Sequence, residues 1–190
     1  MHTGTMPYPE RPLAAALFDT AIGPCAIAWS AVGVLRFQLP EDGAEATLAR
    51  ITRPYRGEPV APAEPTFDIG KAIARIQAHL AGDLDDLRWI PLDTTTIPEF
   101  HRAVYTVTRA IAPGHTLSYG EVAARVGMPN ASQAVGQAMG RNPIPLIIPC
   151  HRVLAADHAL HGFSAHGGLT TKQRLLEIER TPGFGEPTLF

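Results

Sequence analysis

Residues 144–153 read Ile-Pro-Leu-Ile-Ile-Pro-Cys-His-Arg-Val, an apolar run that ends in a thiol, an imidazole and a guanidinium. The run predicts a buried strand or core segment, because its prolines exclude a helix. A thiol beside two potential cations favours a lowered thiol pKa and therefore a nucleophile. A structural cysteine with hydrogen-bonded neighbours is the alternative, which the Cys150-His151 dipeptide alone leaves open.

The composition is that of a globular protein. Hydrophobic residues make up 45% of the 190 residues and charged residues 18%, which excludes a disordered chain. The longest apolar run is far too short for a membrane span, and no signal peptide is predicted. The two cysteines, Cys25 and Cys150, are distant in sequence and give weak support for a disulfide. A reducing, cytoplasmic location is therefore expected.

Charge is distributed unevenly along the chain. Residues 1–100 carry 8 Lys/Arg against 13 Asp/Glu, net −5, whereas residues 101–190 carry 8 against 5, net +3. Residues 101–153 hold five arginines and a single acidic residue, Glu121. A basic second half in an acidic chain fits contact with a phosphate backbone. A surface that is merely uneven is the alternative.

The first half of the chain predicts a small antiparallel sheet. Short runs of strand-forming residues, separated by turns, have the spacing of a meander: residues 14–20, 24–30 and 32–39. Cys25 lies within the second run, where we expect it to be a buried small hydrophobe.

Two helices are expected beside this sheet. The first covers residues 42–51, and the second covers residues 68–80, begins at a capping Asp68 and carries an apolar stripe. The proline-rich segment 54–65 between them is expected to be an exposed connection. The acidic, irregular sequence after the second helix predicts a boundary near residue 90, which gives domains 1–90 and 91–190.

Helix signals dominate the second half. Capping-box patterns predict helix starts at Thr96-x-x-Glu99, Ser118-x-x-Glu121 and Thr170-x-x-Gln173. The helix that starts at Ser118 ends near Val126, and a turn with Gly127 leads to another over residues 131–140, capped by Asn130. This pair predicts a helix-turn-helix whose second member reads DNA. An αα-hairpin that serves only the core is the alternative.

Several motifs of the second half resemble one family. Pro149-Cys150-His151-Arg152-Val153, preceded by Asn142-Pro143-Ile144-Pro145, is similar to the active-site signature of the O(6)-alkylguanine-DNA alkyltransferases, also called methylated-DNA–protein-cysteine methyltransferases. Further matching motifs are Pro113-Gly114-x-Thr116-x-Ser118-Tyr119-Gly120, Ala134-Val135-Gly136-x-Ala138-Met139 and Gly167-Gly168-Leu169. The resemblance covers residues 96–180 closely and the first half in outline. It implies an α+β fold, in which a small RNase H-like antiparallel sheet domain precedes a helical, winged helix-turn-helix domain.

The resemblance implies a suicide reaction in DNA repair. A flipped O(6)-alkylguanine enters a pocket, and the Cys150 thiolate displaces guanine from the alkyl (methyl) carbon in a single, irreversible turnover. The implied partner is alkylated double-stranded DNA, with no cofactor, metal or membrane. We expect a cytoplasmic monomer that associates with the nucleoid through DNA.

The resemblance also implies a role for each matching residue. His151 is the base that takes the Cys150 proton through a bridging water, and Glu179 orients His151. Asn142 is the hinge between recognition helix and active-site segment, and Arg152 is structural. The expected pocket residues are Tyr119, Met139, Val153, Phe163 and Ser164. The expected DNA-binding residues are Thr116, Ser118, Ala131, Ser132, Gln133 and Arg141.

Three positions depart from the family pattern. Gln133 stands where the family has an arginine that fills the gap left by the flipped base, so we expect weaker flipping or weaker DNA affinity. Phe163 replaces a pocket tyrosine. The loop before Gly167 is longer than usual, which makes His166 a candidate to enter the pocket. For the three loop histidines we favour solvated side chains over a metal site: His158, His161 and His166.

Three other functions fit part of the pattern. A non-catalytic lesion-recognition protein that recruits other repair proteins would lack the cysteine, whereas this chain keeps Cys150, His151 and Glu179. Gln133 keeps this alternative open. A DNA-binding regulator switched by methylation would need a separate transcriptional domain. A Cys-His hydrolase would need an oxyanion-hole motif, and none is evident in the sequence.

Overall fold

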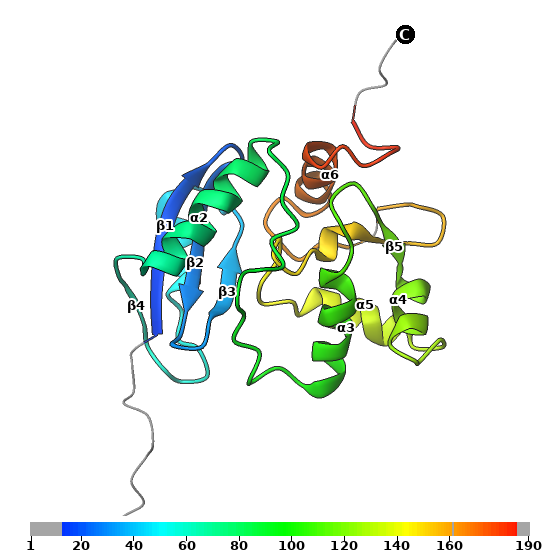
Figure 1. Ribbon diagram of the computed structural model, residues 1–190, viewed down its shortest axis with the longest axis horizontal. Helices are drawn as coiled ribbons and strands as arrows, with labels where there is room; N and C mark the ends of the chain where they lie inside the picture. The colour runs from blue at the N-terminus through cyan, green and yellow to red at the C-terminus, as the bar shows by residue number, and fades with distance from the viewer. Residues whose placement is uncertain (1–12, 161, 186–190) are drawn as a thin grey trace, which may run out of the picture.

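The computed structural model describes residues 13–160 and 162–185. A sheet-containing part lies beside a helical part, at the left and right of Figure 1 respectively. This arrangement confirms the predicted α+β class, with a small sheet preceding a helical region. No helix within these residues is long and apolar enough to cross a bilayer.

The sheet pairs four strands in the order β3-β2-β1-β4. Three of them form the predicted antiparallel meander: β1 (Leu13–Thr20), β2 (Gly23–Trp29) and β3 (Val34–Gln38). β4 (Val60–Pro62) pairs in parallel with β1. The expectation of an exposed connection over residues 54–65 is therefore wrong at β4. Val60 is buried there, and an edge strand tolerates the missing N–H of a proline.

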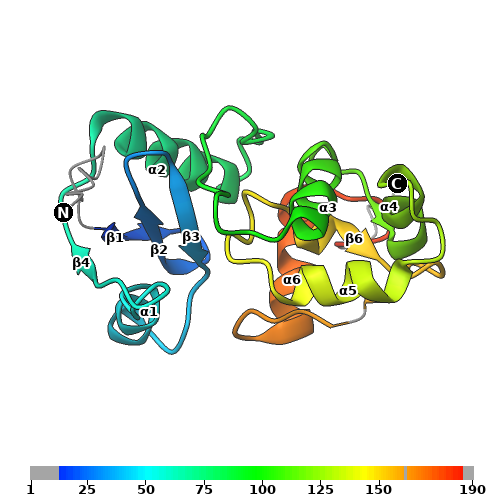
Figure 2. The same cartoon turned by 90° about the horizontal axis from the view of Figure 1, so that it is seen from below.

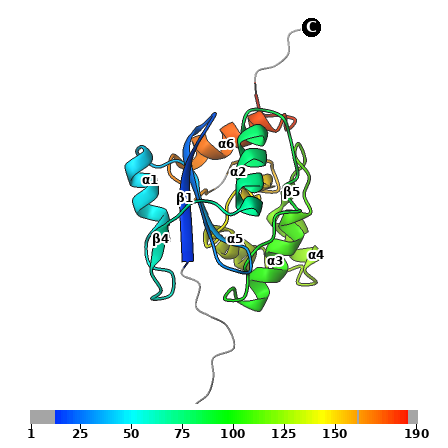
Figure 3. The same cartoon turned by 60° about the vertical axis from the view of Figure 1, so that its left-hand side comes forward.

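Two helices cover opposite faces of this sheet, as Figure 3 shows. α1 (Ala44–Ile51) places Ile51 in a cluster with Ala26 and Leu35. α2 (Phe67–Leu80) lies on the other face, in a cluster with Ile27. The alternation of side chains along β2 produces these two faces, because successive residues of a strand point in opposite directions.

The helical part contains α-helices and a short pair of parallel strands. The helices are α3 (Glu99–Arg109), α4 (Tyr119–Arg125), α5 (Ser132–Gly140) and α6 (Gly168–Ile178). β5 (Leu117–Ser118) pairs with β6 (Val153–Leu154). The 3₁₀ helix η1 (Cys150–Arg152) immediately precedes β6, so the strand pair anchors the cysteine-containing segment on α4.

α4 and α5 are the two helices expected from the helix-turn-helix pattern. The chain leaves α4 at Gly127 with φ +84°, a conformation that favours glycine. Val135 and Ala138 bury one side of α5 in the core, whereas Gln133 on the other side is exposed. Figure 2, the view from below, shows α5 next to α4 in the helical part.

Of the three predicted capping boxes, the structure contains one. Ser118 and Glu121 bond each other's backbone N–H groups at the start of α4. α3 begins after Pro98 and α6 after Gly167, so the predicted boxes at residues 96 and 170 are wrong. Two single caps are also wrong, since the N-caps of α2 and α5 are Thr66 and Ala131 rather than Asp68 and Asn130.

The larger of two clusters of buried side chains is shared by both parts. This cluster extends from Ile27 and Phe37 in the sheet to Val104 and Leu175 in the helices. The predicted domain boundary near residue 90 lies in the segment that joins α2 to α3, and it stays a prediction.

This joining segment lies along the edge of β3. Val34 N–H donates to Pro91 O at 2.9 Å, and Asp93 N–H donates to Val34 O at 2.8 Å. The close approach requires glycine at position 33, because a Cβ atom there would lie 2.5 Å from Pro91 O. Further along the same edge, Phe37 N–H donates to Pro143 O at 3.0 Å, which attaches the active-site segment to the sheet.

Candidate active site

The apolar run before the cysteine is a buried turn. Ile144, Leu146, Ile147 and Ile148 are each at most 1% exposed. Ile148 N–H donates to Ile144 O, and Leu146 has φ +71°, which is rare outside glycine. The strand alternative is therefore wrong and the core-segment alternative is confirmed.

Asn142 ties the two ends of this turn together. Its Nδ2 donates to Ile148 O at 2.8 Å, and its Oδ1 accepts from Ile144 N–H at 3.0 Å. The Asn142 side chain is also close enough to the Cys150 thiol to lower its pKa. One side chain thus bridges the turn between α5 and the cysteine.

The Cys150 thiol is buried at the start of η1, with 6% of the residue exposed. Burial raises its pKa, although the Asn142 side chain, the Lys172 charge and two backbone N–H groups offset part of the effect. The expectation of a lowered thiol pKa is therefore wrong for the resting protein. The guanidinium of Arg152 explains this result, because it bonds Glu179 and Ile111 O instead of facing the sulfur.

The second cysteine behaves as predicted. Cys25 is fully buried in β2, and burial raises the pKa of its thiol to about 12, with Thr20 partly opposing the shift. Both cysteines are free, and Cys150 lines a pocket.

Glu179, the C-cap of α6, is a buried carboxylate that accepts four hydrogen bonds. Its Oε1 accepts from His151 Nε2 (2.9 Å), His79 Nε2 (3.0 Å) and Arg152 Nη2 (2.7 Å), and its Oε2 accepts from Arg152 Nε (2.8 Å). Burial alone would raise the pKa of Glu179, but the neighbouring His151 and the hydrogen bonds hold it far below its ordinary value. The carboxylate is thus anionic.

The tautomer of His151 follows from this bond. Because a carboxylate only accepts hydrogen bonds, His151 Nε2 carries the proton and Nδ1 has the free lone pair. His151 Nδ1 is buried and has no hydrogen-bond partner among residues 13–160 and 162–185. Burial lowers the pKa of His151, partly opposed by Glu179, so the resting ring is neutral and Nδ1 can accept a proton.

Cys150 lines a pocket of about 440 Å³. The pocket wall also includes four of the five predicted pocket residues: Tyr119, Met139, Phe163 and Ser164. Glycines complete the lining at positions 136, 140 and 162. The volume is in the range of small-molecule sites. The fifth predicted residue, Val153, is buried in β6 outside this lining, and its carbonyl accepts from Lys172 Nζ at 2.8 Å.

The two described loop histidines, His158 and His166, do not line this pocket. His166 is exposed, with Nε2 3.3 Å from Asp42 Oδ1 and Nδ1 3.6 Å from Glu41 Oε2. The expectation that His166 enters the pocket is therefore wrong, because its ring meets the acidic residues Glu41 and Asp42, which precede α1. His158 is exposed, and His161 lies outside the described residues. Within the described part of the chain, no group of three or more His, Cys, Asp or Glu residues could hold a metal ion.

The residues predicted to bind DNA lie on or beside the helix pair. Ser132 and Gln133 are exposed at the start of α5, and Arg141 is exposed after its end. Ala131, Thr116 and Ser118 are half-buried. The Ser118 side chain accepts from Glu121 N–H at 3.1 Å, so it also stabilises the start of α4.

His79 is the site residue that the sequence analysis missed. It is fully buried in the last turn of α2, three residues after the buried Ile76. The available signal was a histidine on the apolar stripe of a helix, since a buried imidazole requires polar partners. Its partner could not be identified, because Glu179 is 100 residues away in sequence.

Comparisons with known proteins point to one family. The family model described as "6-O-methylguanine DNA methyltransferase, DNA binding domain" matches residues 99–181. The methylated-DNA–protein-cysteine methyltransferase of Mycolicibacterium paratuberculosis is 43% identical over 119 residues, which are 63% of this chain and 70% of that protein. The corresponding protein of Methanosarcina acetivorans is 40% identical over 111 residues, 57% of this chain and 67% of that protein.

Solved structures extend the similarity over both parts of the chain. The O6-methylguanine methyltransferase of Mycobacterium tuberculosis superposes with a TM-score of 0.69 at 31% identity, covering 88% of this chain and 93% of that one. The M. tuberculosis OGT structure in complex with DNA gives a TM-score of 0.70 at 31% identity, covering 90% and 96%. With this sequence and structural similarity, and a thiol–imidazole–carboxylate site at the matching motif, the chain belongs to the methylated-DNA–protein-cysteine methyltransferase family.

Proposed function

We propose that this protein repairs DNA by transferring the alkyl group of O(6)-alkylguanine to Cys150 in a single, irreversible turnover. The observation that carries the proposal is the position of Cys150, whose thiol lines a pocket and directly precedes a neutral His151 oriented by an anionic Glu179. This is the arrangement of nucleophile, base and orienting group that activates a weak nucleophile.

The Cys150 thiol is not activated in the resting protein. At rest both Cys150 and His151 are neutral, because burial disfavours their charged forms. The thiol proton moves to His151 Nδ1 through a bridging water, and Glu179 stabilises the imidazolium. The sulfur then bonds the alkyl carbon while the carbon–O(6) bond breaks and its electron pair leaves with guanine.

The imidazolium of His151 gives up its proton as guanine takes one up, so the overall change converts thiol and alkylguanine into thioether and guanine. Burial raises the pKa of the Tyr119 hydroxyl, which therefore keeps its proton and can donate a hydrogen bond to the leaving base. The thioether formed on Cys150 is not converted back to the thiol, so each molecule reacts once.

The DNA duplex must release the target base from the stack. The Cys150 sulfur lies inside the protein beside α5, where a stacked base cannot reach it. Extrusion of the nucleotide into the pocket solves this problem. Gln133 is exposed on α5, and we expect it to occupy the vacated space, without the charge and plane of an arginine. We propose a monomer acting on double-stranded DNA in the cytoplasm and nucleoid.

The proposal is tested by intact mass after incubation with an oligonucleotide that contains O(6)-methylguanine. Addition of one methyl group in the wild type, about 14 Da, and its absence in C150S support stoichiometric transfer to Cys150. Retained lesion binding with no mass gain would instead indicate the non-catalytic recognition protein. If the protein shows no lesion binding and no mass gain, both functions are rejected.

A further inference from the structure

His79 connects the sheet-containing part to the carboxylate of the active site. Its ring is fully buried, its Nδ1 accepts from Asp85 N–H at 3.1 Å, and its Nε2 lies 3.0 Å from Glu179 Oε1. A backbone N–H can only donate, so Nδ1 is unprotonated and Nε2 carries the proton. His79 is therefore a neutral hydrogen-bond donor to Glu179, with its tautomer set by the backbone.

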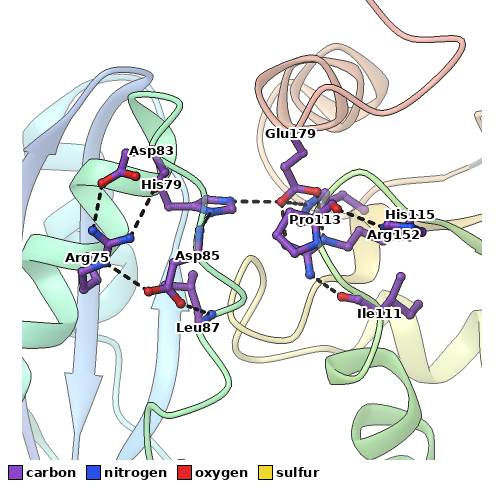
Figure 4. Close-up of polar contacts among 11 residues, drawn as sticks. Arg75, His79, Asp83, Asp85, Leu87, Ile111, Pro113, His115, Arg152 and Glu179 are labelled. Carbon is purple, nitrogen blue, oxygen red and sulfur yellow. Dashed lines mark hydrogen bonds and ion pairs between the residues drawn. The ribbon is translucent and has the colours of Figure 1, made fainter.

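The segment that sets this tautomer is itself fixed to α2. Arg75 donates to Asp85 Oδ2 at 3.1 Å and to Asp83 Oδ2 at 3.0 Å, and Asp85 Oδ1 accepts from Leu87 N–H at 2.7 Å. Figure 4 shows this network on one side and Glu179 with Arg152 on the other, joined by the His79 ring.

The donors to Glu179 come from different segments. His151 and Arg152 both belong to η1, so they move together with Cys150. Glu179 itself belongs to the end of α6. His79 is the donor that comes from the sheet-containing part, and it shares Oε1 with His151. The carboxylate oxygen that orients the base is thus also held from outside the reacting segment.

We propose that His79 is a positioning residue for the reaction of Cys150. By donating to Glu179 Oε1 it fixes the carboxylate, so that His151 keeps Nε2–H on Glu179 and Nδ1 as the proton acceptor. The role in alkyl transfer rests on the proposed function, whereas the role in thiol activation does not. The charged and titratable groups around this contact are Glu179, His151, Arg152, Arg75, Asp83 and Asp85.

Two substitutions separate the two bonds of the His79 ring. Glutamine places an amide nitrogen near the position of Nε2, so H79Q keeps a donor to Glu179. Asparagine places an amide oxygen near Nδ1, so H79N keeps the acceptor for Asp85 N–H and loses the donor. If H79N does not fold, H79F fills the same space without a donor and replaces it.

The first measurement is the rate of Cys150 alkylation by iodoacetamide as a function of pH, without DNA, followed by intact mass with peptide mapping. We expect H79N to react roughly 10-fold more slowly than wild type near neutral pH, because a misoriented carboxylate misplaces the base. The midpoint of the pH profile should move to higher pH in H79N and return toward the wild-type value in H79Q.

The second measurement is the rate of methyl transfer from an O(6)-methylguanine oligonucleotide, with lesion affinity measured in a C150S background. The rate should follow the same order, with affinity unchanged. A lowered thermal midpoint in H79N with an unmoved or downward-shifted pH profile would overturn the inference, as would H79Q that behaves like H79N. If the wild type transfers no methyl group, the proposed function fails, and the iodoacetamide profile still decides the role of His79.

Discussion

Replacing Glu179 by glutamine keeps the side-chain volume and removes the charge at the centre of the site. The amide offers one oxygen and one NH₂ group in place of two acceptor oxygens. In the wild type, Arg152 Nε donates to Glu179 Oε2 at 2.8 Å. If the amide oxygen occupies the Oε1 position, the NH₂ group faces this Arg152 Nε. Two donors then oppose each other, and a guanidinium that is 1% exposed loses its counter-charge.

The expected loss of stability follows from this unpaired charge. Removing one partner of a buried ion pair costs about 3–5 kcal/mol. For a chain of this size 1 kcal/mol corresponds to about 2–4 °C in the unfolding midpoint, so E179Q should unfold roughly 6–20 °C below wild type at pH 7. Alkyl transfer should fall at least about 100-fold, because general-base catalysis typically contributes that much or more.

The stability difference should depend on pH in a defined direction. The folded-state pKa of Glu179 lies below its ordinary value of 4.5, because His151 and the hydrogen bonds outweigh burial. A carboxylate with a depressed folded pKa stabilises the fold fully above its unfolded pKa and progressively less below it. The gap between wild type and E179Q should therefore be constant from pH 7 to about 5.5 and shrink as the pH falls below about 4.5.

The matched control is E177Q. Glu177 lies on the same helix, is half-buried and accepts one hydrogen bond from Gln173 at 2.8 Å. Thermal unfolding from pH 3 to 7, followed by circular dichroism, should show wild-type behaviour for E177Q. An E179Q protein with a wild-type midpoint at pH 7, or a gap that grows toward acid, would refute the argument that Glu179 is a charged, fully used acceptor.

Three further substitutions test other parts of the structure. G33A should destabilise the fold by roughly 1–3 kcal/mol in thermal unfolding, because the new Cβ meets Pro91 O at 2.5 Å. The control G70A places its Cβ in open space on α2 and should be neutral or stabilising. Q133R should bind lesion DNA more tightly in fluorescence anisotropy, with a steeper loss of affinity on adding salt; an unchanged salt dependence would place Gln133 away from the DNA. S118A should lose roughly 1 kcal/mol by denaturant unfolding, and no loss would mean that the capping box is not used.

The sheet and the general position of the site could be predicted from the sequence for local reasons. Strand alternation and turn residues are short-range signals, so the meander over β1 to β3 is close to the predicted residues. The motif around Cys150 identified the pocket region, because Tyr119, Met139, Phe163 and Ser164 belong to neighbouring motifs. β4 escaped prediction because its pairing with β1 is non-local and its proline resembled a loop signal.

The electrostatics of the site could not be predicted from residue order. Adjacency of Cys150, His151 and Arg152 suggested a cationic environment for the thiol, but in η1 the imidazole and the guanidinium both bond Glu179. Direction in a short 3₁₀ segment depends on its tertiary partners rather than on its own sequence. The same limit applies to His79, whose role depends on packing between residues that are 100 positions apart.

The hydrogen bonds along β3 also cover an edge of the sheet that would otherwise be unpaired. β3 is a terminal strand in the sheet order, and unpaired edges are templates for association with other chains. Pro91, Asp93 and Pro143 bond this edge from the joining segment and the active-site turn. The opposite edge is the short, proline-containing β4. A fragment ending at Leu80 would lack Pro91, Asp93 and Pro143 and would therefore expose the edge of β3. Self-association through that edge is the expected fate of the sheet without its helical part.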